Sequence, residues 1–159
     1  MSHGGIYRRY GFLNLDSWAV SDGHFCGCQI AAAPHPYNSH NNDRVRDYIL
    51  SRVQARASKH SDILVSDDVI SNATYAGGQI IYFEGNNILV RIAGKNDNEA
   101  VLFSAHFDSV STAPGATDDG MGVATLLNLI DYFGKNPPAR TLLFNINNGE
   151  EDWLNGAHA

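Results

Sequence analysis

The stretch VLFSAHFDSVSTAPGATDDGMG, residues 101–122, decides the fold of this chain. It begins as an apolar strand, passes His106 and Asp108, and continues through a loop rich in Gly, Pro, Ser and Thr. Asp118-Asp119-Gly120 then open a new element. A strand that leads through a polar loop into the start of a helix favours an α/β sheet with a site at one edge.

The element that follows this stretch is predicted to be a helix, because its apolar residues recur at helical spacing and Pro137-Pro138 end the pattern. TLLFNI, residues 141–146, then forms another apolar strand. Strand, helix and strand make a βαβ crossover, so the strands at 100–104 and 141–146 should be parallel. The helical positions are Val123, Leu126, Leu127, Ile130 and Phe133.

The chain before this stretch should supply one more helix and several strands. We predict a helix capped by Asn42 or Asp43 that fades near residues 58–61, because apolar side chains share one helical face up to Val53. A short strand at 63–65 and a turn-rich segment at 66–78 follow. QIIYF (79–83) and ILVRI (88–92) read as a hairpin joined through 84–87, since Gly and Asn accept positive φ. With the strand at 100–104 they suggest an antiparallel meander, so the predicted fold is α/β with a mixed sheet.

The remaining segments and the composition set limits on the class of protein. We expect residues 1–33 to be irregular, apart from a short helix around 13–20, and His35, His40 and His60 to be surface or cap residues. The chain has 159 residues, of which 43% are hydrophobic and 18% charged, which fits one globular domain. A net charge of -6 argues against nucleic acid as a partner. No apolar run is long enough to cross a bilayer. Asn72 is a glycosylation acceptor if the chain enters a secretory lumen.

Three groups of polar side chains should meet at one edge of this sheet. His106 and Asp108 follow the first parallel strand, Glu150 and Glu151 follow the second, and Asp118 lies where the crossover helix begins. The carboxyl ends of parallel strands and the start of the intervening helix lie at the same edge. Imidazole and carboxylates without thiolate suit zinc in a hydrolytic pair, in which two metals lie about 3.5–4 Å apart.

Each of these signals has an ordinary explanation when it is taken alone. His-x-Asp can be a polar strand end that meets solvent. Asp118 and Asp119 can cap a helix, because Asp is favoured at that position. Glu150-Glu151 can be a solvated acidic loop. The prediction of a site therefore depends on the fold that brings them together.

Three motifs in order resemble the co-catalytic di-zinc aminopeptidase family: HFDSV, PGATDDGMGV and NNGEEDWLNGAHA. PHPYNSHNNDRVRDYI and YFEGNNILVRI look more specifically like its vacuolar membrane protease branch. The resemblance covers residues 34–159, and it implies that this segment is the N-terminal part of a zinc peptidase catalytic domain. It also implies a zinc-exopeptidase-like α/β/α sandwich, incomplete here, a vacuolar location and peptide substrates.

The resemblance also implies a role for each residue of the site. His106 and Glu151 would bind zinc, and Asp118 would bridge two Zn2+ ions. Glu150 would be the general base, and Asp108 would orient His106. The Asp118-Asp119 peptide bond is expected to be cis, as in relatives of this kind.

The family pattern requires one more carboxylate and one more histidine well downstream of Glu151. We therefore expect this chain to be a fragment that binds zinc weakly and shows little turnover alone. Two alternatives stay open, a non-catalytic scaffold of the same fold and a zinc acyltransferase that cyclises N-terminal glutamine.

Overall fold

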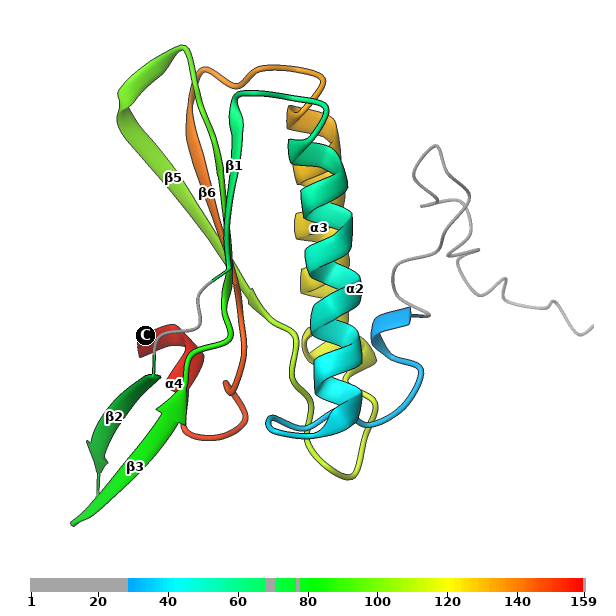
Figure 1. Cartoon of the computed structure of the whole chain (residues 1–159), viewed down its shortest axis with the longest axis vertical. Coiled ribbons are helices and arrows are strands. Elements are labelled where there is room, and N and C mark those ends of the chain that lie inside the picture. Colours follow the sequence, from blue (N-terminus) through cyan, green and yellow to red (C-terminus); the bar gives the residue numbers. More distant parts are fainter. Residues whose placement is uncertain (1–28, 68–70, 77, 159) are drawn as a thin grey trace, which may run out of the picture.

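The computed structural model describes residues 29–67, 71–76 and 78–158 (Figure 1). Most of the segment predicted to be irregular, including the helix expected at 13–20, lies outside these residues. The described elements, in order, are α2 (His40–Ala57), β1 (Ile63–Asp67), β2 (Ser71–Ala76), β3 (Gln79–Glu84), β4 (Ile88–Ile92), β5 (Asn96–His106), the irregular turn η2 (Ala116–Gly120), α3 (Met121–Phe133), β6 (Arg140–Asn147) and α4 (Asn155–His158).

The main sheet is mixed and has the strand order β1-β4-β6-β5. β4 runs antiparallel to both β1 and β6, whereas β5 and β6 are parallel. The helix α3 connects β5 to β6, which confirms the predicted βαβ crossover. The parallel register pairs His106 with Asn147, so both strands end at the same level of the sheet.

The predicted antiparallel meander is wrong. β3 pairs with β2 in a separate two-stranded sheet, and β4 pairs with β1 and β6, which lie far from it in sequence. The segment predicted as turn-rich contains β1's last residues and all of β2. The residues between β3 and β4 therefore form a link from one sheet to the other rather than a hairpin turn.

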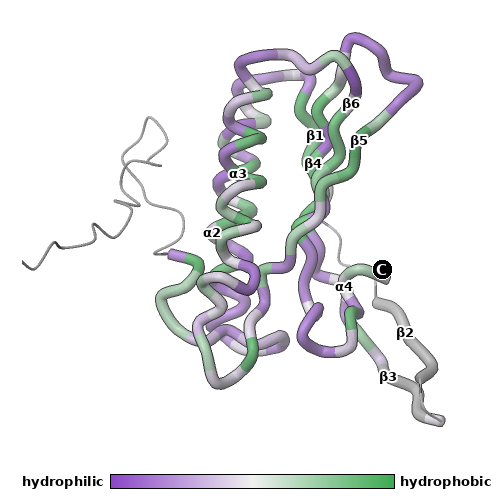
Figure 2. Tube along the Cα trace, turned by 180° about the vertical axis from the view of Figure 1, so that it is seen from behind, coloured by the Kyte–Doolittle hydropathy of each residue, from purple (hydrophilic) through white to green (hydrophobic). Residues whose placement is uncertain are grey.

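Helices α2 and α3 lie side by side on one face of the sheet (Figure 1). Figure 2 shows hydrophobic residues concentrated along the strands and parts of both helices, while the loops at the upper end are mostly hydrophilic and those at the lower end are mixed. The other face exposes Leu64, Leu89 and Leu102, so the described residues form two layers of the expected sandwich. None of the described helices is both long enough and apolar enough to cross a membrane. The core residues include Val45, Ile49 and Val53 of α2, Val123, Leu126, Leu127 and Ile130 of α3, and Val90, Ile92, Leu142, Phe144 and Ile146 of the strands.

Helix α2 begins earlier than predicted. Ser39 is the N-cap, and its side chain accepts a hydrogen bond from the backbone N–H of Asn42 at 3.2 Å. Asn42 lies in the first turn and is only 1% exposed. His35 is also 1% exposed, so its predicted surface position is wrong.

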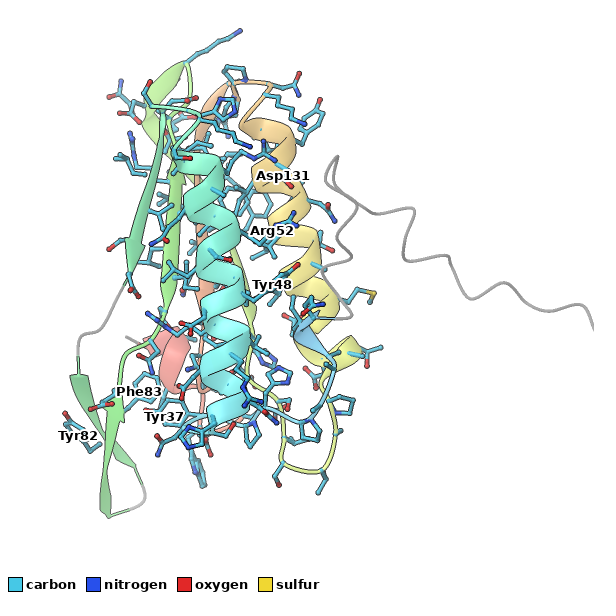
Figure 3. All side chains as sticks on the ribbon, turned by 45° about the vertical axis from the view of Figure 1, so that its right-hand side comes forward. Tyr37, Tyr48, Arg52, Tyr82, Phe83 and Asp131 are labelled. Carbon is cyan, nitrogen blue, oxygen red and sulfur yellow. The ribbon has the colours of Figure 1, made fainter. Side chains whose placement is uncertain are left out.

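Side-chain contacts join α2 to its neighbours at both ends (Figure 3). Arg52 contacts Asp131 of α3 at 3.4 Å. At the other end of α2, the rings of Tyr37 and Phe83 stack with centroids 4.9 Å apart. The Tyr37 hydroxyl accepts the backbone N–H of Glu84 at 3.0 Å, which ties β3 to the start of the helix.

Candidate metal site at the carboxyl end of the sheet

The C-terminal ends of β5 and β6 and the N-terminal ends of α2 and α3 all lie at the lower end of the molecule in Figure 1. His106 is the last residue of β5 and is 8% exposed. Its Nε2 atom lies 3.2 Å from Oδ1 of Asp118 and 3.7 Å from Oε2 of Glu150. The imidazole therefore faces carboxylates from two other segments, as the fold prediction required.

Asp108 is 1% exposed and joins two of these segments. One carboxylate oxygen accepts the backbone N–H of Glu150 at 3.1 Å, and the other accepts that of Glu151 at 3.0 Å. Nδ1 of His106 lies 3.1 Å from the Asp108 carbonyl oxygen and 3.5 Å from its Oδ1. Asp108 thus holds the loop after β6 against the imidazole and leaves Nε2 directed at Asp118.

The sequence left open whether Asp118 and Asp119 cap a helix or face a ligand site, and their side chains differ in this respect. The peptide bond between them is cis, as the resemblance implied. Oδ1 of Asp119 accepts the backbone N–H of Gly122 at 3.1 Å, in the first turn of α3. The Asp118 side chain is 80% exposed and faces His106. The Asp119 carboxylate thus bonds to a backbone N–H at the start of α3, and the Asp118 carboxylate is available to a ligand.

One nitrogen of His106 and one oxygen each of Asp118 and Glu151 lie within 4.8 Å of one another. This is the one group of potential metal ligands found among the residues that the structure describes. Imidazole nitrogen and carboxylate oxygen are ligands that zinc accepts in hydrolytic sites. The spacing allows a cation to contact all three after small side-chain movements.

The electrostatics of the site favour positive charge. Burial alone would lower the pKa of His106, but hydrogen bonding to Asp108 and its charge, with the charge of Glu150, raise it to about 9. Burial tends to raise the pKa of Asp108, yet the hydrogen bonds from His106 and from two backbone N–H groups hold it below its usual value. Burial and the nearby charge of Asp118 raise the pKa of Glu151. A cation among these carboxylates would relieve their mutual repulsion.

Sequence reasoning missed the polar residues that hold the site segments in place. Ser109 bonds to the backbone of His35, and the buried side chain of Asn148 bonds to Asn42. Nothing in the sequence marks these residues, because Ser and Asn are common in loops and their partners lie 74 and 106 residues away.

Comparisons with known proteins show which family and which fold this chain is similar to. Residues 87–159 match the model of "Peptidase family M28". A protein from Laccaria bicolor named "Vacuolar membrane protease" is 68% identical over 133 residues, which cover 82% of this chain and 13% of that protein. The chain thus spans a small part of the length of this relative.

Two solved structures support the fold. A glutaminyl cyclase from Macrostomum lignano is 24% identical with a TM-score of 0.58, over 83% of this chain and 39% of that chain. A "Zn-dependent exopeptidase" from Parabacteroides distasonis is 21% identical with a TM-score of 0.56, over 77% and 43%. Over residues 87–159 the chain is thus similar to peptidase family M28, and it is 68% identical to the vacuolar membrane protease of Laccaria bicolor over the part that the two share.

Proposed function

We propose that this chain carries part of the catalytic site of a zinc-dependent peptidase. The observation that carries the proposal is the cluster of His106, Asp118 and Glu151, whose ligand atoms lie within 4.8 Å of one another at the end of two parallel strands. The residues fit zinc in kind, because one is an imidazole and two are carboxylates. Burial and the nearby charge of Asp118 raise the pKa of Glu151, and the repulsion between these carboxylates is a second sign that a cation belongs there.

In the proposed site the three ligands have different surroundings. Nδ1 of His106 is engaged by Asp108, which fixes the ring and directs Nε2 at the metal position. Asp118 has an exposed carboxylate that faces His106, so it would help to hold zinc. When bound, zinc would supply a Lewis acid and lower the pKa of a coordinated water.

Glu150 is the proposed general base. Its side chain is 32% exposed, and Oε2 lies 3.7 Å from Nε2 of His106, so it borders the metal position and is open to substrate. The backbone N–H of Glu150 is held by Asp108, which fixes the start of this side chain. Its carboxylate would take a proton from the attacking water and deliver it to the leaving amine of a peptide.

The wider setting follows from the relatives. Because a protein 68% identical over the matched part is named vacuolar membrane protease, we propose that the chain derives from a peptidase of the vacuolar membrane. Its substrates would be peptides, and cleavage from the amino terminus is the form of hydrolysis that the sequence motifs favour.

Zinc titration by calorimetry tests the proposal. The unsubstituted chain should bind Zn2+, and His106→Ala and Asp118→Ala should each weaken binding by about 10-fold or more. Asp47→Asn, which changes an exposed carboxylate on α2, is the control and should bind like the parent. Two zinc ions per chain would support a peptidase pair. No binding by the unsubstituted chain would overturn the proposal and favour a scaffold.

A second assay separates peptide hydrolysis from glutamine cyclisation. Peptides with an N-terminal glutamine should lose that residue as free amino acid if the site is a peptidase. Release of ammonia from an otherwise intact peptide would instead identify a cyclase. Glu150→Gln should retain zinc binding and lose the low hydrolysis expected of the parent chain, because it removes the base and none of the proposed ligands.

A further inference from the structure

Asn42 and Asn148 form a reciprocal amide pair in the interior. Nδ2 of Asn42 donates to Oδ1 of Asn148 at 2.9 Å, and Nδ2 of Asn148 donates to Oδ1 of Asn42 at 2.9 Å. The two residues are 1% and 0% exposed. An apolar pair could fill the same space, but two opposed amides satisfy each other in one arrangement only. The pair therefore fixes both the distance and the orientation between the first turn of α2 and the loop after β6.

Asn148 is held from its other side as well. Its backbone N–H donates to Oδ1 of Asn87 at 3.1 Å, and Nδ2 of Asn87 donates to the carbonyl of Gly156 at 2.9 Å. A Cβ at Gly156 would lie 2.1 Å from the carbonyl oxygen of Asn148, so α4 packs directly on this peptide. The two residues that follow Gly149 are the ones whose N–H groups bond to Asp108.

The same short segment before and within α2 also holds the chain after β5. The backbone N–H of His35 donates to Oγ of Ser109 at 2.9 Å, and the Ser109 N–H donates to the His35 carbonyl at 3.3 Å. Asn42 donates to that same carbonyl at 3.2 Å. Residues 35–42 thus contact the segment next to Asp108 on one side and the loop before Glu150 on the other.

We propose that Asn42 is a positioning residue, which acts through Asn148 to place the Glu150-Glu151 loop relative to His106. This role rests on the proposed function, since the placed groups are the proposed base and ligands. It assigns to the N-terminal turn of α2 a part in metal binding although Asn42 does not belong to the ligand cluster. The pair is neutral, so its effect is geometric and should not depend on the charge of the site.

Amide hydrogen exchange of the metal-free chain tests the positioning step by itself. In Asn42→Ala the amides of Glu150 and Glu151 should exchange faster by about tenfold or more, because the loop that presents them to Asp108 is released. Amides of β1 and β4 should keep the protection of the parent. Asn42→Asp is the second variant, because it keeps the size and one acceptor while it removes the donor to Asn148. Asn136→Ala is the matched control, since that exposed asparagine bonds only to the backbone of its own helix end in the described contacts.

The visible absorption of bound Co2+ is a second measurement, and it does not change merely because overall stability falls. Saturated with Co2+, the Asn42 variants should show a changed visible absorption band, and their affinity should fall by about 10- to 100-fold, while Asn136→Ala matches the parent. Equal loss of protection throughout the sheet, or unchanged exchange at Glu150 and Glu151, would overturn the inference. An unsubstituted chain that binds no Co2+ would instead overturn the proposed function, and the exchange measurement would still decide the role of Asn42.

Discussion

Asp108→Asn tests the electrostatics of the site most directly. The Asp108 side chain is fully buried, and its two oxygens accept the N–H groups of Glu150 and Glu151. Asparagine keeps one acceptor oxygen, so one of these N–H groups would face an amide donor. A hydrogen bond to a charged group contributes about 1.5–3 kcal/mol. We expect the free energy of unfolding to fall by about that amount through a part of the loss that does not depend on pH.

His106 adds a part that depends on pH. Its pKa is raised from 6.5 to about 9, and one pKa unit corresponds to about 1.4 kcal/mol, so the protonated imidazole contributes up to about 3.5 kcal/mol. Because the pKa is higher in the folded chain than in the unfolded chain, this stabilisation is complete below about pH 6.5 and is lost as the pH rises through 9. The loss caused by Asp108→Asn should therefore be larger at pH 6 than at pH 10.

Urea unfolding in the presence of a chelator, at pH 6 and pH 10, measures this difference. An NMR titration of the His106 ring should show a lower pKa in Asp108→Asn. Burial lowers this pKa, and the charge of Asp108 that opposes the effect is then absent. Asp47→Asn, the exposed change on α2, should leave both quantities as in the parent. A His106 pKa that stays near 9 in Asp108→Asn, or an equal loss of stability at both pH values, would refute this account.

Three further outcomes follow from the structure. Since His106 must lose its proton to bind metal, zinc affinity should rise about tenfold per pH unit between pH 6 and 9, measured by competition with a chelating dye; a flat profile would contradict this. Gly149→Ala should cost about 1–3 kcal/mol more than Gly78→Ala in urea unfolding, because both have positive φ but only the first places a Cβ 2.5 Å from an aromatic ring of β3. A double-mutant cycle of Arg56→Ala and Asp131→Ala should give a coupling of about 1 kcal/mol between α2 and α3, and a value near zero would show that the contact does not stabilise them.

The parts of the fold that were predictable from sequence are those in which local pattern and topology agree. The helical spacing of α3 lies between two apolar strands, and a crossover of this kind permits only parallel strands. The structure confirms β5, α3 and β6 in that arrangement. Because His106 and the Glu150-Glu151 loop directly follow these two strands, their proximity could be predicted as well.

The pairing of β4 could not be predicted in this way. Its buried and exposed residues alternate, as in any strand with one covered face, and alternation does not identify the neighbouring strand. Turn residues before and after β4 suggested hairpins, but contacts with β1 and β6 prevailed over these local preferences. The predicted cap of α2 was wrong for a related reason. Ser39 and Asn42 are both good capping residues, and only the tertiary partner of Asn42 decides between them.

The register of β5 against β6 is what makes the proposed site possible. His106 lies opposite Asn147, so the residues after each strand leave the sheet at the same level, and the backbone N–H of Phe107 donates to the carbonyl of Asn147 at 2.9 Å. A shift of one residue would turn His106 to the other face of the sheet and carry its imidazole away from Asp118. The short polar contacts of Asp108 with the loop after β6 exist only in the observed register. The strand pairing and the candidate metal site are therefore two consequences of one arrangement, and a substitution that weakens the pairing should weaken metal binding with it.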